Sequence, residues 1–233
     1  MKKLLTCLFV IAISQIAIAQ DANTVVVNPL KQSEQEVRSK IYQFPQFLVG
    51  QAIYKNETVT EAKLNYNYFT NNILFINPKG DTLELSEGEN FSAIVIGADT
   101  FRYYKKQFLL QLTHNTVYNL LVKRSLKFNG TEKKGAYDTY SSTAASTSYN
   151  NIQVQGVGMV KLIPDENSLY TFTDEYFFSG RFAQFYPATK KGLHEFFAKN
   201  EKQLKEFLDE NNINLAKKDD LDKVLEFALK TLR

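Results

Sequence analysis

The sequence is poor in the residues that most often form thiol and metal sites. It has one cysteine, Cys7, and two histidines, His114 and His194, among 233 residues. Because Cys7 lies in the N-terminal segment that we expect to be removed, the mature chain would have no cysteine for a disulfide, a thiolate site or a nucleophile. Two histidines so far apart do not suggest a transition-metal site. We therefore expect no cofactor, no metal, and a fold held by its apolar core alone.

Tryptophan and a strong net charge are also missing. The chain has 28 basic and 25 acidic residues, and removal of Lys2 and Lys3 leaves 26 against 25. Nucleic-acid binding requires a concentrated basic face, so we predict no nucleic-acid partner. The absence of tryptophan argues against a platform on which sugars stack. What is abundant is aromatic: 18 Phe and 13 Tyr favour a β-sheet with an aromatic core.

The N-terminus has the features of an export signal. Lys2 and Lys3 precede an apolar stretch over 4–18, which ends in the small-residue motif Ala17-Ile18-Ala19. The stretch is interrupted by polar residues and is shorter than the about 20 apolar residues of a membrane span. We predict a cleavable signal peptide over 1–19, with no membrane span afterwards and with the periplasm as compartment. An extracellular or outer-membrane-associated location and an uncleaved N-terminal anchor are the alternatives.

The middle of the chain, 41–188, is predicted to be an antiparallel β-domain, after a polar lead-in over 20–40 that contains one short strand at 25–27. Apolar and polar residues alternate over 58–69, as in a strand with one face on a core and one in water. A turn at 77–81 joins the next two strands. Further strands are expected at 91–96, 100–104, 108–112, 117–128, 152–163, 169–178 and 181–186. Connections this short leave no room for crossover helices.

Two segments depart from the strand pattern. Residues 129–151 are rich in Ser and Thr and are predicted to form a flexible loop within the β-domain. From 189 to 233 the apolar residues recur at helical spacing, and two amphipathic helices are expected, separated by Asn211-Asn212. The predicted fold class is α+β: a mainly antiparallel sheet (a meander, a curved sheet or a partly open barrel) with C-terminal helices packed on it as part of the same domain.

The candidate site residues come from the aromatic strands. Tyr66 and Tyr68 share a face of one strand, and four residues share a face of another: Phe172, Asp174, Tyr176 and Phe178. These six are the speculative ligand contacts. Asp174 interrupts an aromatic face and would be a functional group if it were buried, although a solvated position near a sheet edge is the simpler interpretation. Its neighbour Glu175 points to the opposite face, so the two do not form a carboxylate pair.

The known catalytic motifs are incomplete in this chain. His194-Glu195 begins like the helix of a zinc protease, but Ala198 stands where the second histidine belongs. Gly156-Val157-Gly158 begins like a phosphate-binding loop, but the sequence continues as a strand instead of a helix. Neither motif supports a reaction.

Several segments together resemble a recurrent pattern in exported proteins of Bacteroidota. The matching segments are Gly50-Gln51-Ala52, Ala62-Lys63-Leu64-Asn65-Tyr66-Asn67, 73–76, 91–97 with Phe101, and the lysine-rich tail from Lys190-Lys191-Gly192-Leu193 to Leu221-Asp222-Lys223-Val224. The resemblance covers about 47–128 and 189–231. That family is uncharacterised, so the resemblance implies export and a sheet followed by helices but carries no active site across.

Three function classes remain open at the level of sequence. The first is a non-catalytic envelope protein that binds another protein or surface component through the sheet's open face or edge, and it is favoured because the chain contains no recognisable catalytic set. The second is a carrier or sensor of an apolar small molecule or lipid, held between a curved sheet and the C-terminal helices. The third is an enzyme that uses Asp174 with a second group.

Overall fold

The computed structural model describes residues 24–28, 30–86, 88–134, 140–143, 150–154, 158–162, 167–180 and 184–232. The predicted signal peptide, 1–19, lies outside this range. Within the described part of the chain, we find no helix with the length and apolar character needed to cross a membrane.

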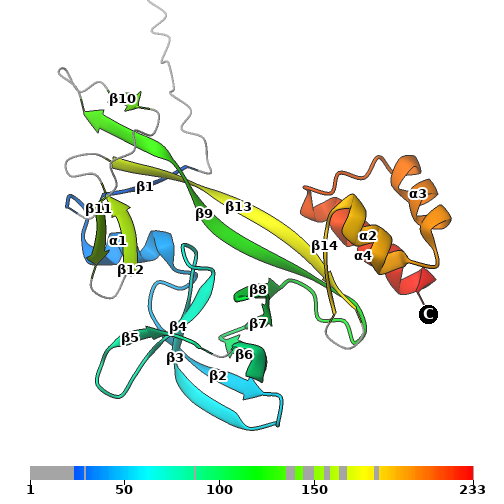
Figure 1. The fold of residues 1–233 in the computed structure, drawn as a ribbon, viewed down its shortest axis with the longest axis horizontal. Coiled ribbons are helices and arrows are strands. Elements are labelled where there is room, and N and C mark those ends of the chain that lie inside the picture. The colour runs from blue at the N-terminus through cyan, green and yellow to red at the C-terminus, as the bar shows by residue number, and fades with distance from the viewer. Residues whose placement is uncertain are drawn as a thin grey trace, which may run out of the picture.

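One large antiparallel sheet dominates the fold and confirms the α+β class (Figure 1). Its strand order is β1-β13-β9-β8-β7-β6-β2-β3-β4-β5, while β10 pairs with β9, and β14 pairs with β13. The bounds are β1 Thr24–Val27, β2 Leu48–Tyr54, β3 Val59–Asn67, β4 Asn72–Ile76, β5 Thr82–Glu84, β6 Phe91–Ile96, β7 Asp99–Tyr104, β8 Gln107–Gln111, β9 Asn119–Lys134, β10 Tyr140–Thr143, β13 Asn167–Ser179 and β14 Phe185–Pro187. A short 3₁₀ helix, η1 (Gly88–Asn90), precedes β6. A separate hairpin consists of β11 (Asn150–Val154) and β12 (Gly158–Leu162).

The sheet curls around its core but does not close into a barrel. The turn between β3 and β4 reaches back to the other side, where the backbone N–H of Leu126 donates to Tyr68 O (3.0 Å). Phe108 N–H donates to Asn71 O (3.0 Å) in the same region. The outer edge of β5 has no neighbouring strand among the described residues, so the sheet ends there.

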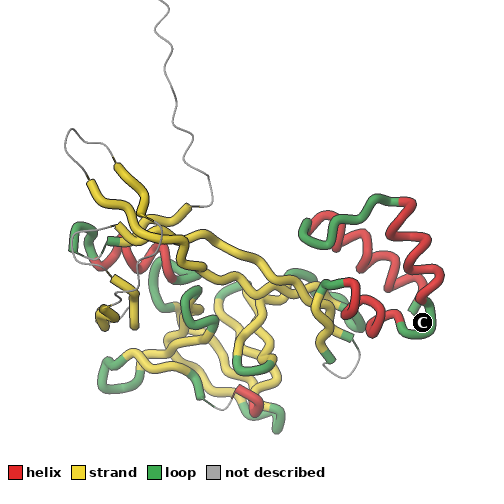
Figure 2. Tube along the Cα trace, turned by 45° about the horizontal axis from the view of Figure 1, so that its top comes forward, coloured by secondary structure: helices red, strands yellow, loops and turns green. Residues whose placement is uncertain are grey.

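Strands β9 and β13 form a long ribbon that leads from the sheet to the C-terminal helices (Figures 1 and 2). β9 extends through 129–134, six residues into the predicted loop, because 130–132 pair with the start of β13 and 131–134 pair with β10. Thr131 lies opposite Ser168 and both are buried. The predicted strand at 152–163 is also divided between β11 and β12. β10 and the first two residues of β11 also fall within the predicted loop, and 135–139 and 144–149 lie outside the described residues.

A helix, α1 (Glu34–Ile41), occupies much of the predicted polar lead-in. It begins with a capping box, in which the Ser33 hydroxyl accepts from the Glu36 backbone N–H while the Glu36 carboxylate accepts from Ser33 N–H. Val37 and Ile41 are its buried residues. Two apolar residues are too few to show helical periodicity in the sequence, so this helix was not predicted.

The C-terminal element has three helices instead of the predicted two. They are α2 (Lys190–Phe197), α3 (Glu201–Glu210) and α4 (Lys218–Thr231). The first predicted helix is interrupted after Phe197, where Asn200 N–H donates to Phe197 O (2.6 Å). Asparagine is common at helix ends, so Asn200 was a signal for the break. In Figure 2 the three helices gather at the far end of the β9–β13 ribbon.

Two main apolar cores result. The sheet core lies inside the curled sheet, and its largest fully buried members include Phe101, Phe108, Ile41, Leu64, Ile73, Ile94 and Ile96. The helical core joins the ribbon's end to α2, α3 and α4 through Leu120, Phe178, Leu193, Phe196, Phe197, Leu204, Leu221, Val224, Leu225 and Ala228. A small third cluster of Leu109, Leu121 and Phe177 lies on the other face of the ribbon.

Candidate functional site

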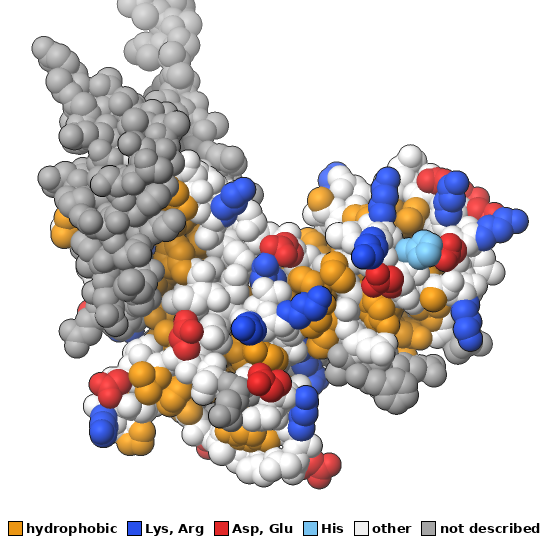
Figure 3. Space-filling model, viewed as in Figure 1, with side chains coloured by type: hydrophobic (Ala, Val, Ile, Leu, Met, Phe, Trp, Pro, Cys, Tyr) orange, Lys and Arg blue, Asp and Glu red, His pale blue; other side chains and the backbone are white. Residues whose placement is uncertain are grey.

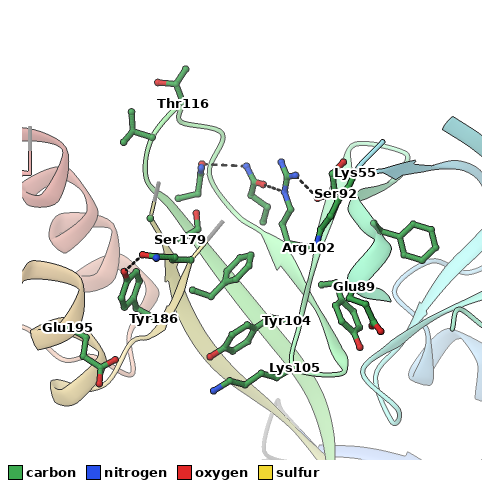
Figure 4. A pocket seen from close by; sticks show the side chains of 18 residues that line it. Lys55, Glu89, Ser92, Arg102, Tyr104, Lys105, Thr116, Ser179, Tyr186 and Glu195 are labelled. Carbon is green, nitrogen blue, oxygen red and sulfur yellow. Dashed lines mark hydrogen bonds between the residues drawn. The ribbon is translucent and has the colours of Figure 1, made fainter. Parts of the chain in front are cut away.

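A groove of about 1080 Å³ lies where the sheet meets the helical end of the ribbon (Figures 3 and 4). One wall comes from β2, η1, β6, β7 and β8, and the opposite wall from β13, β14 and α2. In Figure 3 this connecting region shows Lys and Arg side chains interspersed with apolar ones. The groove is larger than most small-molecule pockets, which range over about 300–1,000 Å³.

The floor of the groove is aromatic. The Tyr104 ring lies 5.3 Å from the Phe185 ring and 5.7 Å from the Phe177 ring, centroid to centroid. Beneath them, Leu109 and Leu121 are fully buried. Tyr104 and Phe185 come from β7 and β14, which are far apart in the sequence, so the floor forms only when the ribbon joins the sheet. Such a floor offers an aromatic, apolar surface to a ligand.

A row of polar groups crosses the wall of the groove (Figure 4). Arg102 Nε donates to Gln111 Oε1 (3.0 Å), and Arg102 Nη1 donates to the backbone oxygen of Ser92 (2.7 Å). Gln111 Nε2 donates to Thr113 O (2.8 Å) and lies 3.4 Å from Asn119 Oδ1. The guanidinium group of Arg102 is therefore held on the wall by hydrogen bonds to uncharged acceptors.

Arg102 is half-buried and forms no ion pair with any residue that the structure describes. Burial lowers its pKa, because the charged form loses hydration. Buried cations in proteins are usually paired with an acid. Because Arg102 is half-buried without an acidic partner, it is the residue of the groove that says most about which ligand could bind there.

The tip of the β7–β8 hairpin is strained. Lys105 and Lys106 form a two-residue turn and both have positive φ, 47° and 64°. Such turns favour Asn and Gly, and each other residue in this conformation costs about 1–3 kcal/mol. Lys105 faces the groove, with its Nζ 5.0 Å from the centroid of the Tyr104 ring. Strain of this kind is typical of functional loops.

Tyr103 and Glu89 form a second polar contact on the sheet side. Burial and then the neighbouring Glu89 carboxylate raise the pKa of Tyr103. The Tyr103 ring lies directly over Gly88, where a β-carbon would come within 2.0 Å of the ring. Gly88 is therefore required for the position of Tyr103 in the groove wall.

The first three predicted contact residues lie in the sheet core. Tyr66 stacks on Phe101 with centroids 5.2 Å apart and donates to Arg124 O (3.2 Å). Tyr68 packs edge-on against Phe172 at 5.0 Å. Burial raises the pKa of Tyr66, and it raises the pKa of Tyr68 to about 12. These residues are close together, but their neighbours are other side chains of the core.

The other three predicted contact residues follow β13 towards the helices. Asp174 forms a two-pronged ion pair with Arg124, at 2.8 Å from Nε and 2.7 Å from Nη2. The Tyr176 hydroxyl is 3.4 Å from Asp174 Oδ2. Phe178 is fully buried in the helical core and stacks on Phe196. The structure thus places three of the six residues in the sheet core, two in the helical core and Asp174 in an ion pair between the cores, and the groove is lined by different side chains.

Sequence reasoning missed the groove because its residues come from several turns and strand ends. The lysine pair at 105–106 between two short strands was the available signal, since lysine is a poor residue for a tight hairpin. A second signal in the sequence was Arg102, a single cation between two aromatic residues, Phe101 and Tyr103.

Neither a candidate metal site nor a similar known protein indicates a function for the groove. Within the described ranges, no three or more His, Cys, Asp or Glu side chains gather in a way that could hold a metal ion. The chain has no significant match among protein-family profiles, curated proteins or solved structures.

Proposed function

We propose that this protein is a non-catalytic binding protein that holds a small molecule in the groove between the β7–β8 hairpin and β14 with α2. The observation that carries the proposal is the combination of an aromatic floor with an ordered polar row. Binding sites commonly join apolar surface to a few well-placed polar groups. A strained hairpin tip at the groove's mouth supports the same assignment.

The position of the groove agrees with a carrier or sensor whose ligand lies between sheet and helices. The charged and polar lining favours an amphiphilic molecule over a purely apolar one, because an apolar ligand would remove water from the Arg102 guanidinium without supplying a charge of opposite sign. Binding of another envelope protein at the sheet's face or edge, which the sequence alone favours over a carrier, is the second candidate function.

We also propose that the protein is exported and belongs with the uncharacterised exported proteins of Bacteroidota that it resembles. Cleavage after Ala19 would make Gln20 the first residue. N-terminal sequencing of the protein from its own host tests this point, since a chain that begins at Met1 would contradict it.

The binding function is tested by native mass spectrometry of protein purified gently from its own host. We expect a mass excess that disappears on denaturation. Thr116→Trp adds bulk at the exposed mouth of the groove and should abolish the excess. The matched control is Thr58→Trp, which places the same residue at an exposed turn outside the groove.

The two variants give a clear decision. Loss of the excess in Thr116→Trp alone supports the groove as the binding site. An excess that survives in both variants would place the ligand elsewhere. A bare mass for the native chain would contradict the proposal and favour the protein-interaction alternative.

A further inference from the structure

Within the part of the chain that the structure describes, the Arg102 guanidinium has hydrogen-bond donors without a protein acceptor. A guanidinium carries five N–H groups. The structure uses one on Nε, for Gln111 Oε1, and one on Nη1, for Ser92 O. Both acceptors are neutral, so neither compensates the charge. The remaining donors and the full positive charge are available to a ligand.

Arg102 is also held in place before any ligand arrives. Gln111 is 9% exposed, and its amide nitrogen donates to Thr113 O, which directs its oxygen towards Arg102. Ser92 O fixes the other side of the guanidinium. A side chain that is already ordered loses little conformational entropy on binding, so its hydrogen bonds contribute more to affinity.

Lys55 adds a second cation to the same wall. Its backbone N–H donates to Asn90 O (2.9 Å), which places it at the end of β2 beside the start of β6. In Figure 4, Lys55 and Arg102 lie on the same side of the groove, close to Ser92. As with Arg102, no acidic residue in the described part of the chain pairs with the Lys55 ammonium.

Two described acidic residues line the groove, and neither forms an ion pair with Arg102 or Lys55. Glu89 interacts with Tyr103, and Glu195 forms a 3.9 Å ion pair with Lys191 on α2. In Figure 4, Glu195 belongs to the opposite wall, on the helical side. Among the described residues, the sheet-side wall therefore carries two cations, Arg102 and Lys55, against one carboxylate, Glu89, and neither cation is held in an ion pair.

We propose that Arg102 and Lys55 bind an oxyanion, a carboxylate or a phosphate, on the ligand whose apolar body lies along Tyr104 and Phe185. This inference rests on the proposed binding function and adds the chemical class of the ligand. Arginine suits planar and tetrahedral oxyanions because its N–H groups can donate in parallel pairs.

The test compares three probes with the same benzyl body: phenylacetate, benzyl phosphate and benzyl alcohol. Each is titrated into the mature protein, and binding is followed by NMR, including the Nε–H signal of Arg102. We expect one or both anions to bind about ten-fold more tightly than the alcohol. A preference for phenylacetate indicates a carboxylate ligand, and a preference for benzyl phosphate indicates a phosphate ligand.

Three variants assign the preference to residues. Arg102→Gln should remove the preference for anions, and Lys55→Gln, which leaves the hydrogen bonds of Arg102 intact, should reduce it several-fold. Lys79→Gln removes the same charge from an exposed turn that does not line the groove and should leave the preference unchanged. An amide spectrum like that of the native protein identifies the variants that are folded.

The outcomes separate this inference from the proposed function. Equal binding of the alcohol and the anions, blocked by Thr116→Trp, would overturn the oxyanion inference and leave the groove as a ligand site. An anion preference that survives in both Arg102→Gln and Lys55→Gln would also overturn it. If no probe binds at millimolar concentration, the inference is wrong, and native mass spectrometry still decides the proposed function.

Discussion

The sheet core and the helical core lie on the same face of the β9–β13 ribbon but are stabilised differently. Phe172 of β13 packs on the sheet core, and Phe178 of the same strand packs under the helices. The sheet core contains buried asparagines, Asn65 and Asn67, whereas the fully buried residues of the three C-terminal helices are apolar or glycine. Hydrogen bonds to buried polar groups therefore fix one core, and apolar contact dominates the other.

Charged side chains on the β9–β13 ribbon separate the two cores. Halfway along the ribbon, Arg124 lies opposite Asp174 on the face that carries both cores. Lys123 lies opposite Glu175 on the other face, with Nζ 2.6 Å from the carboxylate. Cross-strand pairs of opposite charge stabilise a ribbon modestly and fix its register. The ribbon thus passes from one core to the other through a polar section.

Alkaline pH should have the largest effect and should act on the sheet core. Burial raises the pKa of Tyr42, Tyr68 and Tyr170 from about 10 to about 12, so each stays protonated in the folded protein after it would ionise in the unfolded chain. Their contribution to stability is complete below pH 10 and is lost as the pH rises towards 12. We expect the protein to unfold in this window, as followed by circular dichroism and tyrosinate absorbance.

Tyr68→Phe sharpens this prediction. The free energy of unfolding of the native protein falls as the pH rises between the unfolded and folded pKa values of Tyr68. Because the variant has one titrating group fewer, this slope should be less steep by about 1.4 kcal/mol per pH unit. Urea unfolding at several pH values measures this slope. A free energy of unfolding that does not change up to pH 12 would show that these tyrosines are solvated.

Phe178→Ala should break the helical core. Removing a fully buried phenylalanine costs about 3–5 kcal/mol, because contacts are lost and a cavity remains. Hydrogen exchange should then rise in α2, α3 and α4 while β2, β3 and β6 stay protected. Phe108→Ala, the matched change in the sheet core, should give the reverse pattern. Equal loss of protection in both regions would mean that the two cores unfold as one unit.

Much of the sheet could be predicted from the sequence because its signals are local. The alternation over 58–69 and the turn at 77–81 correspond to β3 and the β4–β5 connection. The extension of β9 through 129–134 could not be predicted, since this polar segment becomes a strand only when partners such as β13 and β10 lie beside it. The capping box of α1 was readable at Ser33 and Glu36, but few apolar residues follow it.

The candidate site was less accessible to sequence reasoning. Aromatic residues on strands drew attention to Tyr66, Tyr68 and Phe178, which the structure places in packed cores. Periodicity identifies buried faces, so it selects core residues more readily than groove residues. The groove depends on where Arg102 meets Gln111 and where Tyr104 meets Phe185, and those contacts follow from the tertiary arrangement.

Asn65→Ala should have a smaller but substantial effect on the sheet core. Asn65 Oδ1 accepts from the backbone N–H groups of Phe44 (3.1 Å) and Tyr66 (2.9 Å), and its Nδ2 donates to Phe44 O (2.9 Å). Leaving such buried groups unsatisfied costs about 1–3 kcal/mol each, so we expect a loss of roughly 2–4 kcal/mol in urea unfolding. Asn115→Ala, at an exposed asparagine, is the control. A loss no greater than the control's would show that water replaces these hydrogen bonds.

The smallest effect on the free energy of unfolding is expected at the ion pair that lies between the two cores. Asp174→Asn removes one partner of the pair with Arg124, but the two side chains are 23% and 49% exposed, so solvent screens their attraction. A double-mutant cycle with Arg124→Gln should give a coupling of about 1 kcal/mol or less in urea unfolding. Because Asp174 does not line the groove, the variant should retain the mass excess seen by native mass spectrometry. Loss of that excess with an unchanged unfolding midpoint would instead assign Asp174 a functional role and return attention to the ribbon's polar section.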